Sequence, residues 1–182
     1  MITNEDLFRE AMTLYYEQGG KFTMDSLAAR LGISKKTLYE LVRSKEDLAV
    51  QLVEFYFAGV AELQNAIHAD VSLPALEKLR KLLCATPETP MRKYHLQELK
   101  ASFPAAYKVL DEHLRQGWER TLAVLAQAKA EGSIRDIDSG LFSRIYAASI
   151  EELLMENDIT SDLTFRQKQA QLVDILLFGI YK

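Results

Sequence analysis

The sequence predicts an all-α protein with about nine helices. Apolar residues recur three and four positions apart over long stretches, which is the period of an amphipathic helix. No segment alternates polar and apolar residues with the period of two that marks a half-buried strand. The chain of 182 residues holds only 8 glycines and 4 prolines, so few helix breakers are available.

Three short helices are predicted in the first part of the chain. The first ends at Gly19-Gly20. The second is expected over 24–30 and the third over 35–41, with hydroxyl side chains placed to cap them at Thr23 and Ser34. The apolar face of the first helix is formed by Leu7, Ala11, Leu14 and Tyr15.

Longer helices are predicted behind residue 46. The fourth follows Ser44 and Asp47, which resemble a capping box, and extends to about Asp70. It is expected to bridge a domain at 1–46 and a second domain at 47–182. The remaining helices are expected from Pro74 toward a loop bracketed by Pro87 and Pro90, over 92–102, over 104–130 with a stop at Gly132, from Asp138 or Ser139 to about Asn157, and from Leu163 or Thr164 onward.

A short basic strip occurs in a chain that is acidic overall. The formal net charge is −4, yet between positions 30 and 45 five basic residues accompany one acid, Glu40, which gives 5 − 1 = +4. Because counterion release depends on charges near the phosphates, such a strip can bind DNA. The basic residues are Arg30, Lys35, Lys36, Arg43 and Lys45.

The segment from Met24 to Leu41 has the pattern of a helix-turn-helix, in which two short helices pack steeply through a tight turn. Gly32 lies at the turn, where a positive φ is needed. Ala28 supplies the small side chain at the helix crossing. The positions expected to face the core hold Leu27, Leu31, Ile33, Leu38 and Leu41. A purely structural helix pair is the alternative, which the full pattern and the local charge disfavour.

The second helix of this motif is expected to enter the major groove with its N-terminal end first. Lys35 and Lys36 lie on its first turn and can donate to guanine O6 and N7, and Thr37 can contact a base edge. Phosphate contacts are expected from Thr23, Tyr39 and Lys45. Together with Ser34, these residues form the candidate DNA-binding set: Thr23, Ser34, Lys35, Lys36, Thr37, Tyr39 and Lys45.

Residues 22–28, 32–39 and 44–48 resemble the signature of the TetR (tetracycline-repressor-like) family, in a match that covers about residues 7 to 52. The resemblance implies a dimer of nine or so helices and DNA contacts from the matching residues above. It also implies an inducer pocket in the helical body and dimerisation through the last two helices. A ligand-responsive regulator, most simply a repressor on a palindromic operator, is the leading interpretation.

The chain departs from the family pattern at two places. An aromatic pair commonly follows the recognition-helix tyrosine, whereas this chain has Leu41-Val42. Basic residues commonly precede the first helix, whereas Asn4-Glu5-Asp6 stand here with only Arg9 nearby. DNA affinity is therefore expected to rest more heavily on Lys35 and Lys36.

Apolar residues supply candidates for a ligand pocket and for a dimer interface. Most aromatic residues are expected to fill the core, since that is their usual place at helical spacing. The candidate pocket residues are Phe55, Gly59, Leu63, Phe103 and Trp118. Broad apolar faces on the last two helices give the candidate interface residues Phe142, Ile145, Tyr146, Leu153, Val173, Leu176, Leu177 and Ile180. The alternative is that these two helices bury each other.

Other chemistry is weakly represented. No nucleophile and base pair, phosphate loop or metal-ligand spacing is found, so we expect no enzyme and no cofactor. His68, His95 and His113 fall on three different helices, and independent histidines are favoured over a metal site. The single cysteine, Cys84, indicates a buried thiol in a reducing cytoplasm, and no signal peptide or membrane span is expected.

Two functional classes remain open at this stage. In the first, a small molecule bound in the body changes the separation of two recognition helices and so lowers operator affinity. Gly59 in the bridging helix is a candidate for easing such a shift, and close packing against a neighbour is the alternative reading of that glycine. In the second class, the helical body of a DNA-associated protein binds another protein, which an exposed apolar patch would favour.

Overall fold

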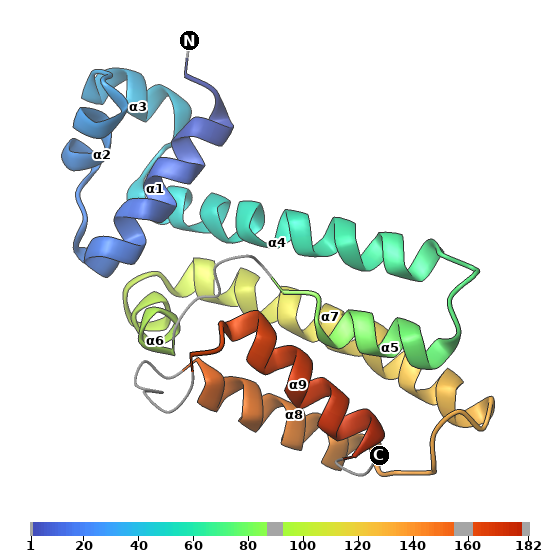
Figure 1. The fold of residues 1–182 in the computed structure, drawn as a ribbon. Helices are drawn as coiled ribbons and strands as arrows, with labels where there is room; N and C mark the ends of the chain where they lie inside the picture. Colours follow the sequence, from blue (N-terminus) through green and yellow to red (C-terminus); the bar gives the residue numbers. More distant parts are fainter. Residues whose placement is uncertain (1, 87–92, 155–161, 180–182) are drawn as a thin grey trace. The chain divides into compact units, whose positions relative to one another are not determined.

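The computed structural model describes residues 2–86, 93–154 and 162–179. Within these ranges the chain forms nine α-helices and one 3₁₀-helix, η1, and no strand (Figure 1). The all-α class predicted from the sequence is thereby confirmed. The elements are α1 (Asn4–Gln18), η1 (Gly19–Lys21), α2 (Met24–Leu31), α3 (Lys35–Leu41), α4 (Lys45–Ala69), α5 (Ala75–Leu83), α6 (Lys93–Ser102), α7 (Pro104–Ala130), α8 (Ser139–Leu153) and α9 (Phe165–Phe178).

The predicted start and stop residues of the short helices are confirmed. The Thr23 hydroxyl accepts a hydrogen bond from Ser26 N at 3.0 Å, which caps α2. Gly32 ends α2 with φ +65°, a left-handed conformation that favours glycine. Differences are small: Pro74 precedes α5 as its N-cap instead of lying inside it, and α8 ends at Leu153. Residues 155–157, expected to extend α8, lie outside the described ranges, as do Pro87 and Pro90.

The chain divides into two compact units. Unit 1 comprises residues 1–58 and 94–113, and unit 2 comprises residues 59–93 and 114–182. The borders therefore fall within α4, after the first residue of α6, and within α7. The domain division at residue 46 remains a prediction from the sequence.

Unit 1 contains the helix-turn-helix. Its core includes side chains that are at most 1% exposed: Leu7, Leu14, Leu27, Leu38, Val42 and Leu48. One core prediction is wrong, because Leu41 is 40% exposed and the next residue, Val42, is buried. The backbone of Val42 leaves the helix in an extended conformation (φ −135°, ψ 134°), so that the side chain after the last helical residue turns inward.

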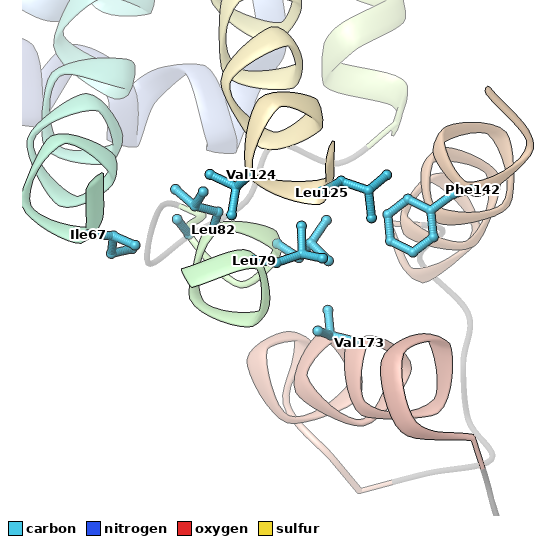
Figure 2. Packing of buried hydrophobic residues seen from close by; sticks show 9 residues of the cluster. Ile67, Leu79, Leu82, Val124, Leu125, Phe142 and Val173 are labelled. Atoms are coloured by element: carbon cyan, nitrogen blue, oxygen red, sulfur yellow. The ribbon is translucent and has the colours of Figure 1, made fainter. Parts of the chain in front are cut away.

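Unit 2 is built around a leucine-rich core to which α5, α7, α8 and α9 contribute. Figure 2 shows Leu79 and Leu82 of α5 near Val124 and Leu125 of α7, with Phe142 and Val173 from the two last helices. The carbonyl of Leu83, at the end of α5, connects α8 and α9 to this helix. Gln169 Nε2 of α9 donates to Leu83 O at 2.9 Å, and the Tyr146 hydroxyl of α8 donates to the same oxygen at 2.5 Å. Burial raises the pKa of Tyr146 to about 12, so this hydroxyl stays a donor.

Candidate nucleic-acid interface

Helix α3, the second helix of the helix-turn-helix, has a buried side and a polar, exposed side. Leu38 is fully buried, whereas Lys35, Lys36, Thr37, Tyr39 and Glu40 are all exposed, as predicted. The Ser34 hydroxyl accepts from Thr37 N at 3.0 Å and lies 2.9 Å from the Thr37 hydroxyl. The cap therefore fixes the first turn of α3, which carries both lysines.

The basic residues of the strip differ in their partners. Arg30 lies between two acids of α1, at 2.9 Å from Glu10 and 2.8 Å from Glu17, so its charge is compensated within the protein. Lys35 Nζ lies 2.7 Å from an Asp25 carboxylate oxygen on the first turn of α2. The hydrogen bond and charge of Asp25 raise the pKa of Lys35, which keeps this ammonium protonated. Lys36 makes no ion pair with the described residues.

The three residues predicted to contact phosphates differ in their exposure and in the hydrogen bonds that they already make within the protein. Thr23 is exposed at the start of α2, but its hydroxyl already caps that helix. Tyr39 is 44% exposed on α3. Lys45 is only partly buried, yet its ammonium donates to the backbone carbonyl of Gly20 at 2.6 Å. The structure thus places Lys45 inside unit 1's own hydrogen-bond network.

The candidate pocket residues, whose role stays a prediction, are divided between the two units. Phe55 and Phe103 belong to unit 1, where the Phe55 ring lies 5.3 Å from the Phe8 ring and Phe103 is 6% exposed. Gly59, Leu63 and Trp118 belong to unit 2. There Leu63 is 46% exposed, and Trp118 packs beside Tyr146 with ring centroids 5.4 Å apart.

The candidate interface residues divide between core and surface. Phe142 and Val173 are buried within unit 2, and Tyr146, Leu176 and Leu177 pack partly against the same core. Leu153 is partly buried, and Ile180 lies outside the described residues. Ile145 is 44% exposed on α8. Sequence reasoning missed three further exposed apolar residues of these helices, namely Leu141, Ile175 and Phe178.

The histidines and the cysteine singled out from the sequence lie in separate surroundings. His95 is buried between the rings of Tyr15 and Tyr16, and His113 pairs with Glu54 at 2.8 Å. Among the described residues, no three His, Cys, Asp or Glu side chains are grouped so as to hold a metal ion. Burial raises the pKa of the Cys84 thiol, which opposes a nucleophilic role. None of the helices in the described ranges combines the length and apolar character needed to cross a bilayer.

A helix-turn-helix with lysines on the exposed first turn of its second helix defines a DNA-binding protein of the regulator class. Residues 7–52 match the model of the bacterial regulatory proteins of the tetR family. The chain is 32% identical over 177 residues to the HTH-type transcriptional regulator YvaF of Bacillus subtilis (strain 168), covering 96% of this chain and 93% of that protein. The chain belongs to the TetR family of transcriptional regulators.

Solved structures share this fold across almost the entire chain. One is AibR in complex with isovaleryl coenzyme A and operator DNA, with a TM-score of 0.75, 18% identity, and coverage of 97% of this chain and 98% of that chain. Another is FadR from Bacillus subtilis in complex with stearoyl-CoA, with a TM-score of 0.71, 18% identity, and coverage of 98% and 100%.

Asp25 lies beside a residue of the candidate DNA-binding set and was not singled out from the sequence. Its carboxylate is the partner of Lys35, the first residue of the recognition helix. The only signal in the sequence is an acid in the first turn of α2, a place where acids are common because they favour the positive end of the helix dipole.

Proposed function

We propose that this regulator is a ligand-responsive repressor that binds a palindromic operator as a dimer. The observation that carries the proposal is the first turn of α3, where Lys35, Lys36 and Thr37 are exposed while Leu38 holds the helix to the core. A helix anchored on one side and polar on the other can enter the major groove and donate to base edges.

Within this proposal, the roles of the basic residues follow from their partners. Lys36 has its full charge available for a guanine edge or a phosphate. Lys35 must first leave or share Asp25, which lies 2.7 Å away. Arg30 contributes little, because Glu10 and Glu17 already compensate it. Affinity for DNA therefore rests chiefly on α3, with Lys36 as its strongest contact.

Dimerisation through α8 and α9 is supported by their surface. Each helix carries exposed apolar side chains three or four positions apart, Leu141 with Ile145 on α8 and Ile175 with Phe178 on α9. Such strips are the kind of surface that a twofold partner buries. A twofold protein reads two inverted half-sites about one helical turn apart.

An acyl-coenzyme A is the ligand class we propose. Support comes from AibR and FadR, which share the fold and are bound to isovaleryl coenzyme A and stearoyl-CoA. Of the predicted pocket residues, the apolar members of unit 2, Leu63 and Trp118, are the ones we assign to the acyl chain. Ligand binding would change the spacing of the two recognition helices and so lower operator affinity.

The test is a titration of the operator complex, monitored by fluorescence anisotropy of a labelled duplex obtained by selection from random DNA. Stearoyl-CoA and isovaleryl-CoA are added separately, with free coenzyme A as the control for the shared nucleotide part. Release of the duplex by an acyl-CoA but not by coenzyme A is the expected result. Tight, specific DNA binding that no acyl-CoA changes would refute the ligand class and leave DNA recognition intact.

A further inference from the structure

The ammonium of Lys45 is enclosed by groups of unit 1. It donates to Gly20 O at 2.6 Å, and it lies 4.5 Å from the centre of the Phe22 ring and 5.5 Å from that of the Phe103 ring. A cation over two aromatic faces is attracted by their electron-rich π systems. The Lys45 ammonium thus already contacts one carbonyl and two aromatic rings, whereas the family pattern implies that it contacts a phosphate.

The rings around Lys45 come from segments far apart in the sequence. Phe22 follows η1 and is 2% exposed, and Phe103 precedes α7 and is 6% exposed. Glycine at position 20 lets the Phe103 ring lie close to the backbone, because a Cβ at this position would lie only 3.2 Å from a ring carbon of Phe103. We call Gly20, Phe22, Lys45 and Phe103 the Lys45 joint.

The neighbouring residue strengthens the same connection. Glu46 Oε1 accepts from Ala105 N at 3.0 Å, at the first turn of α7. Adjacent residues at the start of α4 therefore bind the region between α6 and α7, one through its ammonium and the other through its carboxylate. Only residues 42–44 separate the end of α3 from Lys45. Because Lys45 is the first residue of α4, the joint fixes the position of α4 relative to α3.

We propose that Lys45 is a positioning residue for DNA binding, which holds the region between α6 and α7 against the helix-turn-helix and does not contact a phosphate. The inference rests on the proposed function of α3. Its physical basis is that a phosphate contact would require the ammonium to leave a carbonyl and two ring faces. Burial also lowers the pKa of Lys45, with the Glu98 carboxylate opposing that shift, which agrees with an enclosed ammonium.

The first test is the salt dependence of operator binding. Each phosphate contact contributes about 0.9 to the slope of log affinity against log salt concentration. Lys45→Met keeps most of the side-chain volume and removes the charge, and Lys36→Met is the matched control on the exposed face of α3. We expect Lys36→Met to lower the slope by about one, whereas Lys45→Met weakens binding roughly fivefold with an unchanged slope. A fall of about one in the slope of Lys45→Met would overturn the proposal.

A companion variant tests the joint without removing the lysine. Phe103→Leu is expected to weaken operator binding to a similar extent as Lys45→Met, and the double variant should be no weaker than the weaker single variant. Independent, additive losses in the double variant would contradict a shared joint.

A measurement on the unmodified protein covers the case in which these variants do not fold. The amines of the free protein and of its DNA complex are labelled with a trace of acetic anhydride, and each lysine is quantified by mass spectrometry. We expect Lys45 to react more slowly than Lys36 in the free protein, and of these two lysines we expect DNA to protect only Lys36. Equal rates in the free protein, or protection of Lys45 by DNA, would refute the inference. Failure of the protein to bind any duplex would instead refute the proposed function, and the labelling of the free protein would still test the joint.

Discussion

At the residue scale, two adjacent lysines on α3 have different surroundings. Lys35 is held 2.7 Å from Asp25, whereas Lys36 has no acidic partner among the described residues. An acid beside a DNA-reading lysine competes with the phosphates and adds repulsion of its own. Under the proposed mode of DNA binding, we expect this pair to limit affinity while it orients the Lys35 side chain.

Asp25→Asn is expected to raise operator affinity. The change frees Lys35 and removes one negative charge near the DNA, for a gain of roughly two- to fivefold at low salt that shrinks as salt is added. Anisotropy titrations at several salt concentrations would measure it, with Asp111→Asn on α7 as an exposed control for the same change in charge. An equal gain in operator affinity for Asp111→Asn would show that the change in net charge alone explains the effect and that the Lys35–Asp25 ion pair plays no part.

Gly32→Ala is expected to destabilise the protein through the backbone alone. Gly32 has φ +65°, and a Cβ added there would meet no atom within 4 Å beyond its own stretch of backbone, so no clash with packed neighbours adds to the cost. The left-handed conformation costs a side chain about 1 kcal/mol. Urea unfolding followed by circular dichroism would show a lower midpoint, and an unchanged midpoint would contradict the assigned turn.

At the element scale, Gly59 has no packing reason to be glycine. A Cβ there would meet no atom of the described residues within 4 Å, which argues against the close-packing alternative. Alanine in a helix interior is favoured over glycine by about 1 kcal/mol, so Gly59→Ala is expected to raise the midpoint of thermal unfolding. If helix flexibility at this position serves the ligand response, the same variant should release operator less readily on adding acyl-CoA. A lower midpoint would indicate that position 59 contacts something outside the chain.

The elements were largely predictable because their signals are local. Apolar period, hydroxyl caps and Gly32 lie within a few residues of the helices that they define, and the observed bounds of α2 and α3 follow them closely. The partners of the charged residues were not predictable, because Lys45 meets Gly20 and Phe103 only once distant segments have packed. That Val42 and not Leu41 is buried in the core likewise depends on the backbone conformation at the end of α3.

At the scale of the whole molecule, the proposed dimer depends on the apolar strips of α8 and α9. Ile175→Asp places a charge on a side chain that is 51% exposed in the single chain, so folding should survive while the twofold interface does not. Sedimentation velocity is expected to show a dimer for the original protein and a monomer for the variant. Ala147→Asp, an exposed change on α8, is the control for added charge. A dimer that persists in Ile175→Asp would place the interface elsewhere.

The most direct test of the account is selection of random duplex DNA by the protein at a fixed salt concentration, followed by sequencing. It is repeated with Lys35→Ala/Lys36→Ala and with Lys81→Ala/Lys108→Ala, which removes one exposed lysine of α5 and one of α7. We expect an enriched palindrome with half-sites about one helical turn apart, retained by the control and lost in the α3 variant. No enrichment, or the same enrichment in the α3 variant, would contradict recognition of DNA by this helix.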